Sequence, residues 1–295
     1  NPVMELNRDL SVLALESYRK GTSHDITVLD AMTGCGIRGI RYAMEVQNLA
    51  CVALNDIRMT ASNLARQNVE KNQVEDRTEV TCSDANLVLA LHSLPHNRFD
   101  VVDLDPFGSP APFLDSAVRA ASDNGLIALT ATDMPPLCGI RPKAALKKYG
   151  GRPLRTEYCH EIGLRLLVGS LVSASARHDM GMAVKFAHST DHYFRVYATV
   201  QHGGTKASQA VDEIGFIAHC FHCLHREVST RVTSIAPNCR ICGHRNALAG
   251  PLWLGKLHEK EFCRQMLDLV NAKQLGKRNR IQRLLGMVLQ EIENV

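Results

Sequence analysis

The stretch Ile26-Thr-Val-Leu-Asp-Ala-Met-Thr-Gly-Cys-Gly-Ile-Arg-Gly39 decides the fold of this chain. It opens as a short apolar run of the strand type, which ends at Asp30. The glycines Gly34, Gly36 and Gly39 follow, and the segment through Glu45 is expected to be helical. A strand that enters a helix through a glycine-rich turn is typical of the first unit of an open α/β sheet, which binds its ligand at this point.

The same alternation of strand and helix continues along the chain. We expect a helix before this unit, over residues 3–19, and further strands over residues 52–56, 78–82, 99–105 and 125–131. Helices are expected over residues 59–72, 113–121 and 155–177. Such alternation predicts a parallel sheet that helices cover on both faces.

Two more strands, over residues 182–187 and 193–201, are separated by only a few polar residues. They are predicted to form an antiparallel hairpin, since a parallel pair needs a crossover of a dozen residues or more. A hairpin after five strand–helix units indicates the class I methyltransferase fold, a Rossmann-like α/β fold with a mostly parallel seven-stranded sheet. The pair Gly203-Gly204 predicts a boundary between a catalytic domain over residues 1–203 and a smaller C-terminal α+β domain over residues 204–295.

The glycine loop alone leaves the ligand open. Gly34, Gly36 and Gly39 match the dinucleotide pattern G-x-G-x-x-G, which favours NAD. Asp56 ends the second strand, where a carboxylate can bind both ribose hydroxyls of NAD or of S-adenosylmethionine. Asp84, at the end of the third strand, adds a polar group on the same rim, unless it only caps the following helix. A tight turn without any ligand is the remaining alternative.

The loop after the fourth strand separates these alternatives. Asp105, Pro106 and Phe107 leave the carboxyl end of that strand together. NAD enzymes have no standard need for this combination, whereas methylation of an exocyclic amine does, because the lone pair of that nitrogen is delocalised into the ring. A carboxylate that accepts its N–H favours the nucleophilic form, and an aromatic ring can stack on an extruded base for about 1–3 kcal/mol. The alternative is a proline-containing turn with Phe107 packed in the core.

Several separated motifs resemble those of the tRNA guanine-N2 dimethyltransferases, the family that makes N2,N2-dimethylguanosine at position 26 of tRNA. They are Asn1-Pro-Val-Met-Glu-Leu-Asn-Arg-Asp9, Asp30-Ala-Met-Thr-Gly-Cys-Gly-Ile-Arg-Gly39, Val52-Ala-Leu-Asn-Asp56, Asp105-Pro-Phe-Gly-Ser-Pro110, Arg155-Thr-Glu-Tyr158 and Gly250-Pro-Leu-Trp253. The resemblance extends over essentially the whole chain. Because the chain begins within the first motif, and family members extend further at the C-terminus, we expect some substrate-contacting residues to lie outside this sequence.

The resemblance implies transfer of methyl groups from S-adenosylmethionine to the exocyclic N2 of guanine 26 in tRNA. It implies that Arg8 and Arg38 contact the donor near its carboxylate, that Asp56 holds the ribose, and that Asp84 with Ala85 holds the adenine. The glycine loop is expected to complete the donor site with Thr33, Gly34 and Gly36.

By the same resemblance, Asp105 is the catalytic carboxylate and Phe107 the stacking residue, with Pro106 between them. No role is assigned to Cys35. Two alternatives stay open: a guanine-N2 or adenine-N6 methyltransferase that acts on another RNA or DNA, and an inactive tRNA-binding protein with the same fold.

The cysteines divide into two groups. Cys220-x2-Cys223 and Cys239-x2-Cys242 are separated by 15 residues, a spacing typical of a structural four-cysteine zinc site. Such a closed thiolate shell has no open position for water, so we expect the zinc to support folding. The alternatives are four reduced thiols or a zinc-dependent DNA-binding module. The other cysteines are scattered, as in a reduced intracellular protein, and we predict a cytoplasmic location.

Composition permits a nucleic-acid partner without requiring one. The chain has 34 Lys and Arg against 30 Asp and Glu, a net charge of +4, and aromatic residues make up only 5%, which disfavours a broad base-stacking surface. The better candidates for tRNA backbone contacts follow the fifth strand: Lys143, Lys147, Lys148 and Arg152. A second basic group is either a phosphate-binding face or an ordinary solvated one: Lys273, Lys277, Arg278, Arg280 and Arg283. No apolar run reaches the roughly 18 residues of a membrane span, and we expect a monomer without an obligatory protein partner.

Overall fold

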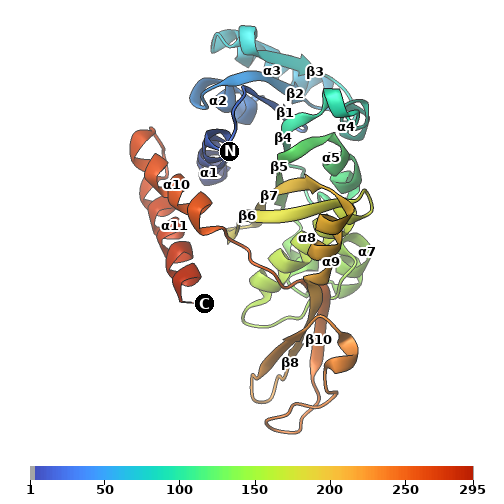
Figure 1. Ribbon diagram of the computed structural model, residues 1–295. Helices are drawn as coiled ribbons and strands as arrows, with labels where there is room; N and C mark the ends of the chain where they lie inside the picture. Colours follow the sequence, from blue (N-terminus) through green and yellow to red (C-terminus); the bar gives the residue numbers. More distant parts are fainter. Residues whose placement is uncertain (1–3, 295) are drawn as a thin grey trace.

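The computed structural model describes residues 4–294 and confirms the predicted fold class. Its central sheet has seven strands in the order β3-β2-β1-β4-β5-β7-β6 (Figure 1). The strands are β1 (Ile26–Asp30), β2 (Leu49–Asn55), β3 (Thr78–Thr81), β4 (Phe99–Leu104), β5 (Ala121–Ala131), β6 (Met180–Thr190) and β7 (Tyr193–His202). Neighbouring strands from β3 to β5 are parallel, whereas β7 runs antiparallel to both β5 and β6.

One face of the sheet is covered by helices from both ends of the chain. They are α1 (Glu5–Lys20), α2 (Ile37–Glu45), α3 (Met59–Lys71), α10 (Lys260–Ala272) and α11 (Arg278–Glu293). Leu10 and Leu13 of α1 share one hydrophobic cluster with Val101 of β4, Met266 of α10 and Leu285 of α11. The helices α10 and α11 therefore lie beside α1, although more than two hundred residues separate them in sequence (Figure 1).

The opposite face carries α4 (Ala85–Leu91), α5 (Leu114–Ala120), α6 (Met134–Leu137), α7 (Pro142–Tyr149) and α8 (Cys159–Ala176). Side chains of a strand alternate between the faces, so Val102 and Leu104 of β4 join this second cluster with Leu167 of α8. Both faces of the sheet are thus buried, which explains the near-continuous apolar runs of its strands.

Element boundaries differ from the prediction in places where tertiary contacts override local pattern. The long helix α8 begins at Cys159 instead of residue 155, because the preceding segment is held in extended form: Arg152 exchanges backbone hydrogen bonds with Gly250, with N–O distances of 2.9 and 2.8 Å. The first described helix residue is Glu5, and the predicted start at residue 3 lies outside the described part of the chain.

Residues after Gly203 form a helix and a small second sheet before the chain returns to α1. Helix α9 (Gly204–Asp212) packs on β6 and α8, and the sheet has the order β10-β8-β9, with β8 (Ile214–His219), β9 (Arg226–Ser229) and β10 (Ala247–Trp253). The division into residues 1–203 and 204–295 stays a prediction. Within residues 4–294, no helix combines the length and apolarity that crossing a membrane requires.

Candidate active site

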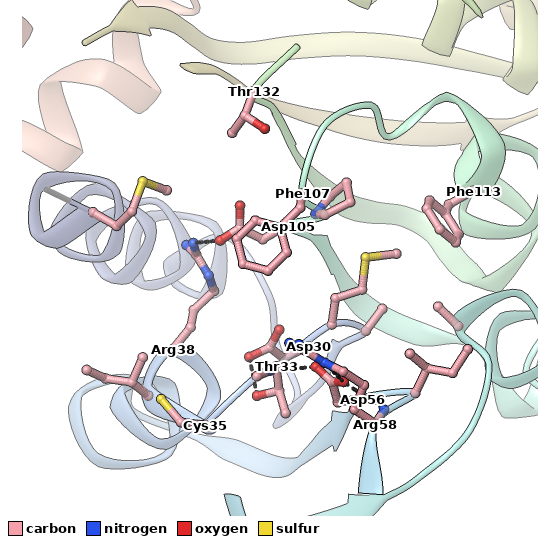
Figure 2. A pocket seen from close by; sticks show the side chains of 18 of the residues that line it. Asp30, Thr33, Cys35, Arg38, Asp56, Arg58, Asp105, Phe107, Phe113 and Thr132 are labelled. Carbon is pink, nitrogen blue, oxygen red and sulfur yellow. Dashed lines mark hydrogen bonds and ion pairs between the residues drawn. The ribbon is translucent and has the colours of Figure 1, made fainter. Parts of the chain in front are cut away.

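A cavity of about 620 Å³ opens at the carboxyl ends of the parallel strands (Figure 2). Of the eleven residues predicted to bind the donor or to act in catalysis, ten line it: Arg8, Thr33, Gly34, Arg38, Asp56, Asp84, Ala85, Asp105, Pro106 and Phe107. This is the edge at which open α/β sheets bind their ligands. The volume also falls within the range of about 300–1,000 Å³ that is typical of small-molecule sites.

Gly36 is the exception, since it faces the protein interior. Its φ of 83° lies in the left-handed region, and a Cβ there would meet Ile40, Ala65 and Leu54 at 3.1–3.3 Å. Gly36 therefore acts through backbone shape: it turns the chain from β1 into α2 and lets this helix pack against β2.

The two acidic residues that follow β2 and β3 take part in local hydrogen bonds. Asp56 accepts from the backbone N–H groups of Gly34 (3.0 Å) and Arg58 (2.9 Å), so it fixes the glycine loop. Asp84 accepts from the N–H of Leu87 (3.2 Å) and caps α4, which was the alternative considered for it. Both side chains nevertheless line the cavity, so capping and ligand contact are compatible here.

Asp30 is a site residue to which the sequence analysis gave no role. Its Oδ2 accepts from the hydroxyl of Thr33 (2.7 Å) and from the N–H of Gly39 (3.1 Å). Burial, and then the nearby Asp103 carboxylate, raise the pKa of Asp30 to about 7. A carboxylate at the last position of the first strand, just before the glycines, was the signal that could have identified it.

The carboxylate of Asp105 is bound by a guanidinium group. Arg38 Nη2 donates to Asp105 Oδ2 (Figure 2). Arg38 Nη1 donates to Ser11 Oγ at 2.6 Å. Arg38 lies in the cavity wall as expected, but it also contacts the candidate catalytic carboxylate, which the sequence did not predict. The ion pair engages one oxygen of Asp105 and orients the other.

Positive charge gathers where α1 meets α2. Arg8, Arg38 and Arg41 lie close together, and burial together with the guanidinium groups of Arg38 and Arg41 lowers the pKa of Arg8. Arg41 Nη1 donates to Asp9 at 2.7 Å, which ties the two helices together. Carboxylates of this chain also lie here, since Arg41 binds Glu45 as well as Asp9 and Arg38 binds Asp105.

Phe107 projects into solvent from a loop that is itself well fixed. Its side chain is 96% exposed, so the alternative of a ring packed in the core is wrong. The N–H of Gly108 donates to Thr132 Oγ1 (2.7 Å), and the N–H of Thr132 donates back to Gly108 O (2.8 Å). Gly108 has a φ of 92°, which favours glycine at this turn. Backbone and side-chain hydrogen bonds therefore fix the loop, which holds the exposed ring of Phe107 beside the cavity.

A buried ion pair beneath the cavity is a second feature that sequence reasoning missed. Asp103 of β4 and Arg195 of β7 are both 0% exposed, and Arg195 donates to both oxygens of Asp103, at 2.9 and 2.7 Å. In the sequence these two residues stand inside apolar strand runs, where their pairing across the sheet gives no local signal.

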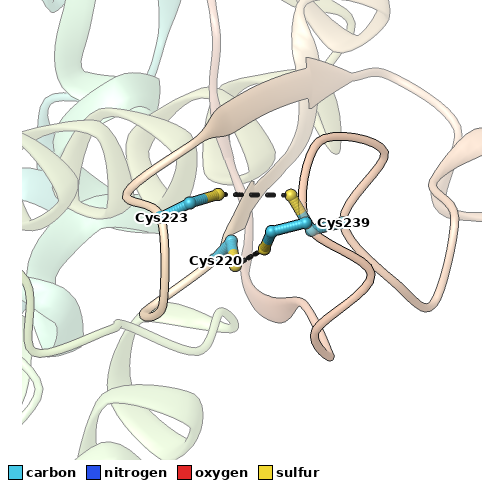
Figure 3. Close-up of side chains that lie close together, drawn as sticks. Cys220, Cys223 and Cys239 are labelled. Atoms are coloured by element: carbon cyan, nitrogen blue, oxygen red, sulfur yellow. Dashed lines mark hydrogen bonds between the residues drawn. The ribbon is translucent and has the colours of Figure 1, made fainter.

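The predicted metal ligands converge on one point. The sulfur atoms of Cys220, Cys223, Cys239 and Cys242 all lie within 4.8 Å of one another, and two pairs are separated by 3.4 and 3.5 Å (Figure 3). In a tetrahedral zinc site with Zn–S bonds of about 2.3 Å, sulfur atoms lie about 3.8 Å apart. The N–H of Ile241 donates to Cys239 Sγ at 3.4 Å, as expected for a thiolate turn. This donor set fits a zinc ion.

The two basic groups differ in their surroundings. Lys143, Lys147 and Arg152 are exposed, whereas Lys148 pairs with Asp133 at 2.9 Å. In the tail, three of the five cations bind acidic groups of this chain: Lys273 lies 3.6 Å from Glu16, Lys277 3.1 Å from Glu5 and Arg280 2.7 Å from Asp191. The tail therefore contributes to helix docking, which favours the structural alternative for those three.

Comparison with known proteins agrees with this geometry. The sequence matches the family described as N2,N2-dimethylguanosine tRNA methyltransferase over residues 1–295. It is 42% identical to the tRNA (guanine(26)-N(2))-dimethyltransferase of Methanosphaera stadtmanae, over 99% of this chain and 74% of that protein. It is 36% identical to the tRNA (guanine(26)-N(2)/guanine(27)-N(2))-dimethyltransferase of Aquifex aeolicus, again over 99% and 74%.

The structure resembles that of Trm1 from Pyrococcus horikoshii in complex with S-adenosyl-L-methionine. The TM-score is 0.88 at 34% identity, over 98% of this chain and 77% of that one. The family expected from the sequence motifs is thereby confirmed: this chain belongs to the N2,N2-dimethylguanosine tRNA methyltransferases.

Proposed function

We propose that this protein transfers methyl groups from S-adenosylmethionine to the exocyclic N2 of guanine 26 in tRNA and forms N2-methyl- and N2,N2-dimethylguanosine. One observation carries the proposal: a carboxylate, Asp105, and a fully displayed aromatic ring, Phe107, stand together at the rim of a cavity that suits the methyl donor. The curated relatives named above carry the same activity in their names.

The cavity offers a complementary group for each part of the donor. Arg8 and Arg38 would hold the carboxylate, and Asp56 would bind the ribose hydroxyls. Asp84 and Ala85 would flank the adenine, while Thr33 and Gly34 form the floor. When bound, S-adenosylmethionine supplies a methyl group activated by a positively charged sulfur.

The protein's part in catalysis is to orient and activate a weak nucleophile. Guanine must leave its stack, because its amine is inaccessible inside the tRNA. Phe107 stacks on the extruded base, Pro106 stiffens the loop, and Asp105 accepts an N–H of the amine, which stabilises the positive charge that develops on nitrogen. The monomethylated amine retains one N–H, so the same contact serves a second transfer.

The proposal also covers the metal site, the contacts with tRNA and the oligomeric state. Zinc at Cys220, Cys223, Cys239 and Cys242 would hold the β8–β10 sheet together, and this needs the reduced thiols of a cytoplasmic protein. The exposed cations Lys143, Lys147 and Arg152 would contact tRNA phosphates, together with the region after Gly203. The protein would act as a monomer.

The test is mass spectrometry of nucleosides from tRNA incubated with enzyme and isotope-labelled donor. We expect labelled N2-methyl- and N2,N2-dimethylguanosine, which disappear when guanine 26 is replaced by adenine. Asp105→Asn should slow transfer about 100-fold or more while the donor still binds. The matched control is Asp115→Asn, which removes an exposed carboxylate that pairs with Arg177 at 2.9 Å.

Other outcomes would identify the alternatives. Labelled N6-methyladenosine would favour an adenine methyltransferase. Binding of tRNA without label in any nucleoside would favour an inactive tRNA-binding protein. An Asp105→Asn enzyme with a near-normal rate would exclude the proposed mechanism.

A further inference from the structure

A buried polar layer lies directly beneath Asp105, on the side of the sheet that α1 and α2 cover. Asp103 and Asp105 stand two positions apart at the end of β4, so their side chains leave the same face of the sheet. Arg195 donates hydrogen bonds to both oxygens of Asp103, at 2.9 and 2.7 Å. This bidentate arrangement gives the pair a defined orientation.

Two neighbouring hydroxyl groups bind this pair. Tyr42 donates its hydroxyl hydrogen to Asp103 Oδ2 at 2.6 Å, and Arg195 Nη1 donates to Thr130 Oγ1 at 2.9 Å. Taking two charges out of water is costly, and well-packed apolar residues often stabilise a core as well as an ion pair does. Stability alone therefore gives little reason for a fully buried Arg–Asp pair at this place.

The pair reaches the catalytic carboxylate through Arg38. The Nε of Arg38 lies 4.0 Å from Asp103 Oδ2, and Ser11 Oγ accepts from both Arg38 Nη1 (2.6 Å) and Arg195 Nη2 (3.2 Å). The remaining nitrogen, Nη2, donates to Asp105 Oδ2. Arg38 is thus fixed by a hydrogen bond to Ser11 and an ion pair with Asp103, and in this orientation it meets Asp105.

Charge balance explains why Asp103 is needed. Burial alone would raise the pKa of Asp103, but Arg195 and Arg38 hold it below its usual range, so the group is ionised. Its charge offsets that of Arg195. Without it, the like charges of Arg38 and Arg195 would repel each other with no carboxylate bound to both.

We propose that Asp103 and Arg195 are positioning residues for methyl transfer: they lock Arg38, which binds Oδ2 of Asp105 and leaves Oδ1 directed at the guanine amine. This inference rests on the proposed function, in which Asp105 accepts the amine N–H. Neither residue touches the donor or the base in this arrangement.

The experiment compares Asp103→Asn with the wild-type protein in single turnovers at saturating donor and tRNA. Asparagine keeps the shape and removes the charge. We expect the transfer rate to fall about 10- to 100-fold, the range seen when supporting groups behind a reactive residue are removed. Because Arg38 would also contact the donor carboxylate, the dissociation constant for S-adenosylmethionine is measured alongside, and saturating donor keeps any weakening of donor binding out of the transfer rate. Val172→Ala, in the apolar cluster on the other face, serves as the control for a purely structural loss.

A double substitution shows whether Asp103 acts through Arg38. In an Arg38→Lys background, where the lock is already broken, Asp103→Asn should slow transfer little further. Effects that multiply would overturn the proposal, and so would an Asp103→Asn rate within about twofold of wild type.

A second variant tests the proposal if Asp103→Asn does not fold. Tyr42→Phe removes only the hydroxyl group that is bound to Asp103, and an unchanged transfer rate in this variant would overturn the proposal. If instead Asp105→Asn keeps the wild-type rate, the proposed function has failed, independently of Asp103.

Discussion

The side chain of Phe107 is exposed in the free protein, so a substitution there should affect substrate binding without affecting the stability of the fold. Its ring is 96% exposed, so Phe107→Ala should change the free energy of unfolding by no more than about 0.5 kcal/mol. Loss of a stacking contact of about 1–3 kcal/mol should lower kcat/KM for tRNA about 5- to 150-fold. Steady-state kinetics together with thermal unfolding measure both. Phe107→Tyr keeps the aromatic face and should restore most of the activity; a Tyr variant as slow as the Ala variant would contradict a stacking role.

Two buried histidines predict how stability depends on pH. Burial, and then Arg195, lower the pKa of His188 to about 3, while burial and Arg165 lower that of His258 to about 4. The unfolded chain takes up these protons below pH 6.5, but the folded protein does not, so the free energy of unfolding should fall as the pH drops from 6.5 towards 4. His258→Gln should reduce the loss between pH 7 and 5 by roughly 1–2 kcal/mol in urea unfolding. The same substitution at the exposed His96 should leave the pH dependence unchanged.

At the scale of elements, the strands were predictable because each is an apolar run between turn residues, and because a short gap between two runs allows only a hairpin. The bounds of helices α4 and α7 were not predicted. These helices span seven and eight residues, too few for a clear helical period. Most of the residues that line the cavity were predictable because they follow strand ends, where the fold gathers them, whereas Arg8 and Arg38 lie on helices and were expected only from the family motifs. The pairing of Asp103 with Arg195 could not, since buried partners across a sheet leave no local pattern.

The small sheet β10-β8-β9 should depend on its metal. Between residues 220 and 246 the only buried side chains are those of Cys220 and Cys239, so the four thiolates must supply much of the order of this segment. We expect Cys242→Ser to reduce the zinc content of the purified protein to background and to expose residues 220–246 to limited proteolysis. Binding of S-adenosylmethionine should persist, since the donor cavity lies at the main sheet. The control is Cys51→Ser, which replaces an equally half-buried cysteine outside this cluster and should retain the metal.

At the scale of the whole molecule, α10 and α11 form part of the support for the donor site. Asp9 of α1 accepts from the backbone N–H of Lys277 (3.0 Å) and from Arg41 (2.7 Å), so one carboxylate joins α1, α2 and the start of α11. The neighbouring Arg8 lines the cavity. Helix α11 is amphipathic, with Ile281, Leu285 and Val288 buried, but an amphipathic face does not reveal in the sequence which helix will cover it.

Detaching α11 should therefore weaken donor binding. Leu285 is 0% exposed against α1 and α10, and Leu285→Asp would bury an unpaired charge there. We expect the dissociation constant for S-adenosylmethionine to rise about tenfold or more. The reason is that Arg8 would lose its proposed charge-assisted hydrogen bond to the donor carboxylate, and such a bond contributes about 1.5–3 kcal/mol. Calorimetric titration measures this. Met287→Asp places the same charge on the exposed face of α11 and should bind the donor normally; equal weakening by both variants would show that α11 does not support the site.

The packing of α1 against α10 and α11 also sets an order of events while the chain is being synthesised. The apolar side of α1, with Leu6, Leu10 and Leu13, emerges from the ribosome first, yet part of its cover is the segment from Lys260 to Leu285. At about 5–20 residues per second, that cover arrives roughly 10–50 s later. A nascent chain thus carries the loop with Asp105 and Phe107 well before the helix bearing Arg8 is held in place. Competence to bind the methyl donor is therefore expected only after the segment through Leu285 has been synthesised and has docked on α1.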